Sequence, residues 1–205
     1  AYLWDQGLGL GQSHMVSPSA TTVYTVTASD ACETPDVSAS VTITVSPIPT
    51  ISFSGDTLSG CMPVTTIFNE INVPAGSQCL WNFGDGGVST NCGPVSYDFT
   101  IPGCWDVSLS IETPDGCVST FTQSDYVCVY DYPNAAFSFG PQPTTIQSTT
   151  IEFNNLSTDA NSYLWTFENG TGSSTSTSEN PTFTFPNDYE GEYEVCLEVE
   201  NNYGC

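Results

Sequence analysis

Apolar and polar residues alternate in many short runs along this chain, a pattern typical of β-strands with one buried face. The clearest runs are residues 41–45, 104–112 and 192–200. No long segment has the spacing of an amphipathic helix, and Ser, Thr, Gly and Asn are abundant between the runs. The sequence therefore predicts an all-β protein with many turns.

Two kinds of landmark recur in the same order. These are Trp4, Trp81 and Trp165, each followed by an alternating strand and then by a cysteine, at Cys32, Cys117 and Cys205. Their spacing predicts an internal repeat of about 80 residues, and hence an array of small β-domains. Arrays span distance and present surface, which favours a structural or adhesive protein over an enzyme.

The repeat divides the chain into a partial module at 1–47, a complete module at 50–130 and a module at 135–205 that lacks its last strand. The prolines in residues 46–49 predict a stiff, extended linker. Strands are expected at 51–55, 64–70, 79–84, 88–92, 95–100, 104–112 and 118–129, and then at 136–139, 149–154, 162–167, 182–186 and 192–200. For the incomplete ends, either the full protein continues on both sides or neighbouring protomers supply the missing strands.

The charge balance is extreme, with no Lys or Arg, 23 Asp or Glu, and a net charge of −23. Nucleic-acid binding and membrane-surface binding both depend on basic residues, so neither nucleic acid nor a membrane is an expected partner. No run is apolar enough to insert into a membrane. The charge favours solubility, divalent cations or partners that carry positive charge.

Nine cysteines in a β-repeat chain indicate an oxidising, extracellular compartment. Their spacing does not resemble a zinc site. Cys79 and Cys92 flank a short hairpin and are the first candidate pair, while two of Cys61, Cys104 and Cys128 are expected to pair near the opposite end of that module. The repeated set Cys32, Cys117 and Cys205 is a candidate for links between modules or between chains. The odd total leaves at least one thiol free or paired elsewhere.

Residues 81–86, Trp-Asn-Phe-Gly-Asp-Gly, resemble the signature of PKD domains, a family with an immunoglobulin-like fold. Residues 191–199 resemble the strand that follows in that family, and 103–111 are a variant of it. Residues 16–26 are similar to segments of repetitive surface proteins. The resemblance implies tandem immunoglobulin-like (PKD-like) β-sandwiches, incomplete at both ends. With its cysteines, such an array of modules resembles the gliding-motility-associated adhesins that Bacteroidota export by the type IX pathway.

Aromatic residues at equivalent places are expected to define the cores, because a Trp on a central strand of a sandwich packs between its sheets. They are Trp4, Trp81, Trp165 and Tyr193. The alternative for a Trp at such a place is an exposed ring that stacks on a sugar.

Candidate ligand and modification sites are few, and no cofactor is expected apart from calcium. Asp85 in a Gly-Asp-Gly turn and Asp131 in a linker are candidate calcium ligands. Asn155 and Asn169 lie in N-glycosylation motifs. Thr57, in Asp-Thr-Leu, resembles an O-glycosylation motif of Bacteroidota.

Catalysis finds little support in the sequence, so the chain is not expected to be an enzyme. His14 is the one histidine and has no nucleophile beside it in the sequence. Glu192, Glu194, Glu198 and Glu200 alternate with apolar residues, as on a solvated sheet face.

We therefore predict a structural segment of an extracellular surface filament or adhesin, which self-associates or continues in a longer chain and presents surface to glycans. Assembly through strands donated between protomers is one form of this hypothesis. Two alternatives stay open. One is a non-catalytic PKD region of a secreted hydrolase that binds polysaccharide or protein, and the other is a calcium-dependent adhesion rod.

Overall fold

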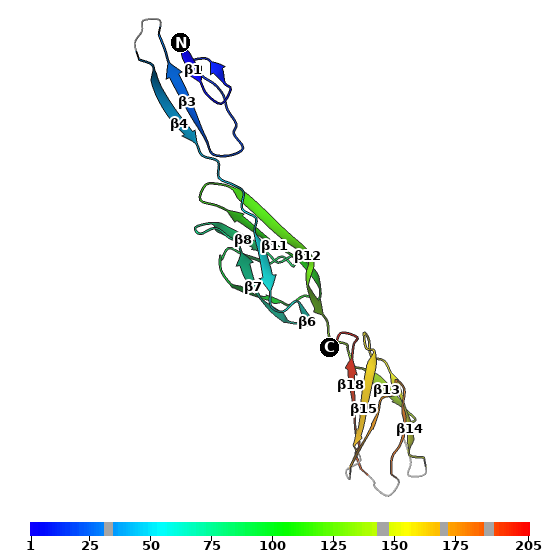
Figure 1. Cartoon of the computed structure of the whole chain (residues 1–205). Coiled ribbons are helices and arrows are strands. Elements are labelled where there is room, and N and C mark those ends of the chain that lie inside the picture. The colour runs from blue at the N-terminus through cyan, green and yellow to red at the C-terminus, as the bar shows by residue number, and fades with distance from the viewer. Residues whose placement is uncertain (31–34, 143–147, 169–171, 187–190) are drawn as a thin grey trace.

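The computed structural model describes residues 1–30, 35–142, 148–168, 172–186 and 191–205, and this part of the chain contains strands and no helix. It accordingly holds no helix long and apolar enough to cross a membrane. The strands form sheets in three successive stretches of the chain, which lie end to end (Figure 1). We call these stretches the first, second and third units.

The first unit is a single antiparallel sheet in the order β2-β1-β3-β4. Its strands are β1 (Tyr2–Trp4), β2 (Gly9–Leu10), β3 (Thr22–Ala28) and β4 (Val37–Ile43). Among its described residues only Tyr24 is buried, because no second sheet packs on either face. Trp4, expected to define a core, is therefore half-buried, and its indole Nε1 donates to Gly11 O at 3.1 Å.

The second unit is a sandwich of a three-stranded sheet, β10-β7-β5, and a five-stranded sheet, β6-β12-β11-β8-β9. Its strands are β5 (Ser52–Gly55), β6 (Ser59–Cys61), β7 (Val64–Ile71), β8 (Gln78–Asn82), β9 (Val88–Ser89), β10 (Val95–Phe99), β11 (Gly103–Glu112) and β12 (Val118–Tyr130). All pairs are antiparallel except that of β6 with β12. Strand β6 was not expected, since Ser-Gly-Cys carries no alternating apolar pattern.

Trp81 lies fully buried between these two sheets. Its ring centroid is 5.2 Å from that of Phe53 and 5.5 Å from that of Phe68, both on the facing sheet. The indole Nε1 donates to Asn91 O at 3.1 Å, so the one polar atom of the ring is satisfied. Alternate residues of β11, namely Val107, Leu109 and Ile111, complete this core.

The third unit repeats this plan with two three-stranded sheets, β13-β14-β17 and β16-β15-β18. Its strands are β13 (Phe137–Gly140), β14 (Thr150–Asn155), β15 (Ser162–Glu168), β16 (Ser173–Ser176), β17 (Thr182–Thr184) and β18 (Glu194–Glu200). Trp165 is fully buried, 5.1 Å from Phe137 between ring centroids, and its Nε1 donates to Ser178 O at 2.9 Å. Tyr193 packs half-buried against the same cluster.

The three units share one pairing pattern. Each Trp pairs with a later alternating strand of its unit, β3, β11 or β18, as Trp4↔Val26, Trp81↔Leu109 and Trp165↔Leu197. The far edges of β3 and β11 are then covered by β4 and β12, whereas β18 is the last strand of its sheet. The prediction of an all-β chain of β-sandwich modules is confirmed for the second and third units, and the first unit has the equivalent of one sheet of such a sandwich.

Candidate functional site: the joint between the second and third units

The end of β18 turns sharply, and the side chain of Asn201 organises this turn. Its Oδ1 accepts hydrogen bonds from the backbone N–H of Tyr203 at 2.9 Å and of Cys205 at 3.0 Å. The backbone N–H of Asn201 in turn donates to Cys205 O at 2.8 Å. Gly204 adopts φ +81°, a conformation that favours glycine. The turn thus presents Tyr203 and Cys205 in fixed positions.

Strand β6 places a cysteine opposite this turn. Parallel pairing of β6 with β12 puts Cys61 beside Tyr130, and the next residue, Met62, donates its N–H to Tyr130 O at 2.9 Å. Cys61 and Cys205 form a disulfide with their Cα atoms 5.5 Å apart and a sequence separation of 144 residues. Cys205 is buried. The bond therefore ties the start of the second unit to the end of the third.

Two further contacts cross the same joint. The rings of Tyr130 and Tyr203 stack with centroids 3.7 Å apart and planes 5° from parallel. The Nδ2 amide of Asn201 donates to Asp131 O at 2.9 Å, which fixes the turn to the linker that leaves β12. One covalent and two non-covalent links thus hold the second and third units together. Figure 1 shows the C-terminus lying at this joint and not at the far end of the third unit.

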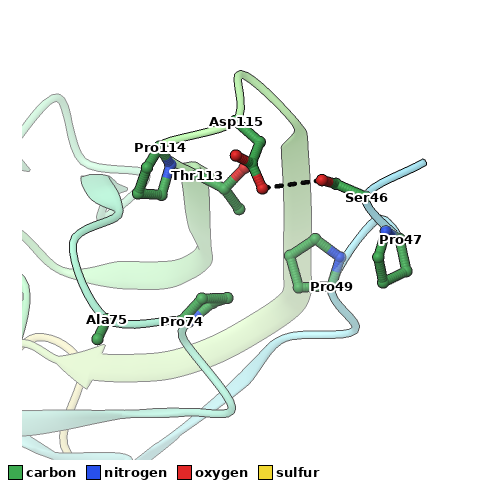
Figure 2. Close-up of a pocket in the computed structure, with 8 residues that line it drawn as sticks. All are labelled: Ser46, Pro47, Pro49, Pro74, Ala75, Thr113, Pro114 and Asp115. Atoms are coloured by element: carbon green, nitrogen blue, oxygen red, sulfur yellow. Dashed lines mark hydrogen bonds between the residues drawn. The ribbon is translucent and has the colours of Figure 1, made fainter. Parts of the chain in front are cut away.

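The joint between the first and second units is lighter. Ser46 Oγ donates to Asp115 Oδ2 at 2.8 Å, and Ser119 Oγ donates to Pro49 O at 2.8 Å. Beside these contacts lies a pocket of about 390 Å³, and Figure 2 shows Ser46 pointing toward Asp115 across it. Its lining includes Pro47, Pro49, Pro74 and Pro114. Because proline has no backbone N–H, these four residues offer no hydrogen-bond donor to a ligand in the pocket.

The remaining cysteines fall into pairs and free thiols. Cys79 is bonded to Cys92, and Cys104 is bonded to Cys128, which lies directly opposite it in the β11–β12 register. Of the repeated set, Cys205 links two units, while Cys117 is a free, half-buried thiol beside the linker at Ser46 O. Cys32 lies outside the described residues.

Cys196 is also a free thiol, and the sequence analysis had not singled it out. It is exposed on β18, with its Sγ 3.8 Å from Glu194 Oε1.

The Gly-Asp-Gly turn uses the carboxylate of Asp85 internally. Tyr97 OH donates to Asp85 Oδ1 at 2.9 Å and lies 3.1 Å from Oδ2, and Gly87 N–H donates to Oδ1 at 3.0 Å. Burial, this hydrogen bond and the negative charge of Asp85 raise the pKa of Tyr97 to about 12. Gly84 adopts φ +87°, and a Cβ there would meet Asp106 O at 2.5 Å. These internal contacts hold the turn in its observed conformation.

The other candidate residues lie apart from one another. Asp131 Oδ1 accepts the N–H of Tyr132 at 2.9 Å, and within the described ranges no three His, Cys, Asp or Glu side chains gather to hold a metal. His14 packs edge-on against Trp4, with ring centroids 6.0 Å apart. Glu192, Glu194, Glu198 and Glu200 are exposed, as expected for a solvated face.

The glycosylation candidates differ in their surroundings. Thr57 is exposed in the loop between β5 and β6. Asn155 is half-buried at the end of β14, and its Oδ1 accepts the N–H of Ser157 at 3.0 Å. Asn169 lies outside the described residues.

Sequence reasoning missed Asn201 and Tyr203 as parts of the joint. The run Asn-Asn-Tyr-Gly-Cys at 201–205 carries the signal of a tight turn, since Asn and Gly favour turns and Asn caps nearby amides. Nothing in the spacing of Cys61 and Cys205 indicated their pairing across the third unit.

Comparison with known protein families agrees with the sandwich fold of the third unit. Residues 136–205 match the profile of the PKD domain. A solved structure concerned with the promiscuous specificity of carbohydrate-binding modules of the β-sandwich superfamily is similar at 14% identity and a TM-score of 0.37, over 75% of this chain and 91% of that one. No curated protein sequence matches the chain. The third unit is thus similar to a PKD domain.

Proposed function

We propose that this chain is a structural, non-catalytic segment of an extracellular bacterial surface filament or adhesin. The observation that carries the proposal is the joint between the second and third units, where the Cys61–Cys205 disulfide and the Tyr130–Tyr203 stack fix two β-sandwiches end to end. Such a joint makes two modules into one stiff rod, which suits a protein that spans distance. We further propose that the units fold as domains with bounds 1–47, 50–130 and 135–205.

Surface chemistry supports an extracellular setting. Three disulfides occur among the described residues, and disulfides persist in oxidising compartments. The absence of Lys and Arg leaves trypsin-like proteases without a cleavage site. Glycans on Thr57, Asn155 and Asn169 would add further protection. These features suit a surface protein of Bacteroidota exported by the type IX pathway, and we include that origin in the proposal.

Assembly through strands is the proposed way in which the segment extends. In the second unit β11 is paired on both sides, by β8 and by β12, whereas among the described strands of the third unit only β15 pairs with β18. Unpaired N–H and C=O groups along such an edge invite another strand. We propose that a strand from a neighbouring protomer, or from a continuation of the chain, pairs with β18.

The assembly is tested on the isolated chain by size-exclusion chromatography with light scattering, followed by hydrogen exchange. Oligomers in which the amides of β18 are protected support strand donation. A monomer with the first and third units fully protected on their own contradicts it. Here the matched reference is β11, whose amides are covered by β12 within the same chain.

The surface location is tested on the cells that make the protein. Gold-labelled antibodies raised against the chain should decorate intact cells, and electron microscopy of the native material should show filaments or rods that contain it. Labelling that appears only after lysis would contradict the proposed function. Glycosylation is read in the same preparation from the mass of peptic peptides that contain Thr57 or Asn155.

A second candidate function is polysaccharide or protein binding by an accessory region of a secreted hydrolase. The observation that favours it is the exposure of aromatic rings at the joint, 56% for Tyr132 and 62% for Tyr203. Exposed aromatic faces stack on sugars. Co-sedimentation of the chain with insoluble polysaccharides, compared with Tyr132→Ala, tests it, since retention that this substitution abolishes would favour this function over the structural one.

A further inference from the structure

The disulfide between Cys61 and Cys205 encloses nearly all of the second and third units. Every strand from β7, which begins at Val64, to β18, which ends at Glu200, lies within the 144-residue loop that it closes. The segments outside the loop are the first unit, the linker, β5 and β6.

We propose that this disulfide is a tension shunt. Force applied between the two ends of the chain passes from β6 through the Cys61–Cys205 bond directly to residue 205, so that residues 62–204 lie outside its path. This inference rests on the proposed function only in assigning the shunt a use, because a filament or adhesin is pulled along its length.

The physical argument compares the two routes between Cys61 and Cys205. The route through the bond is a few covalent bonds long, with the Cα atoms 5.5 Å apart. The route through the backbone lengthens only after sheets and cores have opened, and each hydrogen bond in them contributes little net free energy. Because the covalent route is already taut, the backbone route receives no tension. The strands from β7 to β18 therefore carry no tension.

The tension that remains enters the second unit through two edge strands. β5 is the outer strand of β10-β7-β5, and β6 is the outer strand of the sheet that contains β12. β5 is held by Phe53 in the core and by the N–H of Gly55, which donates to Tyr126 OH at 2.9 Å. β6 is held by its parallel pairing with β12. The first unit has no second sheet over it, so we expect it to extend before these two strands are drawn out.

The non-covalent contacts at the joint position the two sulfurs. Asn201 holds the backbone of Cys205 in its turn and binds Asp131, while Tyr203 rests on Tyr130 beside Cys61. Two of these contacts, the Asn201–Asp131 hydrogen bond and the Tyr203–Tyr130 stack, cross the joint without depending on the disulfide. They therefore favour formation of the disulfide once both units have folded.

Single-molecule force spectroscopy tests the proposal, with enzymatic peptide tags in place of thiols as handles at both ends of the full chain. The two smaller loops, Cys79–Cys92 and Cys104–Cys128, hold back 13 and 24 of the 144 residue steps, which leaves 107. Cys61→Ser with Cys205→Ser should therefore extend further than the wild type by about 370 Å, at about 3.5 Å per residue.

The matched control is Cys104→Ser with Cys128→Ser. Its loop lies inside the shunted segment, so this variant should extend no further than the wild type although it too has lost one disulfide. A wild-type chain that reaches the length of the Cys61/Cys205 variant overturns the shunt. If that variant fails to fold, reductant added to the stretched wild-type chain should lengthen it by the full loop, about 500 Å.

Peptide mapping provides an independent test of the bond. Because the chain has no Lys or Arg, pepsin must replace trypsin, and its acidic medium also suppresses thiol exchange. A linked pair of peptides containing Cys61 and Cys205 is expected, and its absence overturns the proposal. Failure of the chain to reach the cell surface would refute the proposed function but would leave these lengths and this map unchanged.

Discussion

Tyr203 stacks flat on Tyr130 across the joint between the second and third units, with ring centroids 3.7 Å apart. The first ring belongs to a turn at the end of the third unit, and the second ends the longest strand of the second unit, β12. Tyr203 stays 62% exposed, so the contact depends on the match of two faces and not on burial in a core. It makes the joint an interface that can be tested apart from the disulfide.

Replacing Tyr203 by Ala should loosen this joint. Aromatic pairs contribute about 0.5–1.5 kcal/mol beyond their buried area, so the turn at 201–205 should open several times more often. The measurement is the rate at which a mild reductant cleaves the Cys61–Cys205 bond, which should rise in the variant. Tyr132→Ala, which removes an exposed ring from the adjoining linker, is the control, and equal rates in both variants would contradict the role given to the stack.

The three tryptophans should differ in what they contribute to stability. Trp81 and Trp165 are fully buried between sheets, so Trp→Ala at either position should cost about 3–5 kcal/mol, near the stability of a small domain. Trp4 is half-buried on a single sheet, and Trp4→Ala should cost far less. Denaturant unfolding followed by fluorescence measures all three. A loss at Trp4 as large as that at Trp81 would show that a second layer covers the first unit in solution.

The repeat and the alternating strands could be predicted from the sequence because both follow from local spacing. β7 and β11 bury every second residue, as in Phe68 or Leu109, and this pattern is visible without any partner. β6 could not be predicted, because Ser59–Cys61 is held by parallel pairing with a strand about 70 residues away and not by its own composition. The partial exposure of Trp4 could not be predicted either, since full burial needs a facing sheet and the sequence of β1 does not show whether one is present.

The candidate site was less predictable than the fold. The pairs Cys79–Cys92 and Cys104–Cys128 join residues that a short loop or neighbouring strands bring together. Such pairs can be proposed from the expected strands and hairpins alone. Cys61 and Cys205 meet only because the third unit folds back to the joint, which is a property of the whole array. The hydrogen bond from Tyr97 to Asp85 could likewise not be predicted, since one side chain comes from a turn and the other from β10.

The pKa of Tyr97 makes the second unit sensitive to high pH. Its folded value of about 12 lies above the usual value of 10, so the folded state retains the phenol proton more tightly than the unfolded state does. The stability from this group is therefore fully present below about pH 10 and is lost as pH rises toward 12. Asp85→Asn, which removes the neighbouring charge, should lower the pKa of Tyr97 and flatten this loss.

Two measurements check this pH dependence. Ultraviolet titration of tyrosinate should show one high-pH component that moves to lower pH in Asp85→Asn and disappears in Tyr97→Phe. Denaturant midpoints should fall less between pH 10 and 12 in both variants than in the wild type. If the highest tyrosinate component persists unchanged in Tyr97→Phe, the assignment to Tyr97 is wrong.

Removal of calcium should leave the stability of the chain unchanged. The carboxylate of Asp85 already accepts from Tyr97 and Gly87, and Asp131 Oδ1 accepts from Tyr132, so a cation at either place would have to displace a hydrogen bond. Melting curves in excess calcium and in EDTA, at equal ionic strength, should therefore superimpose. Magnesium at the same concentration controls for screening of the charge of −23, which any divalent cation provides. A rise in the melting temperature specific to calcium, and lost in Asp85→Asn, would instead identify this turn as a metal site and favour a calcium-dependent adhesion rod.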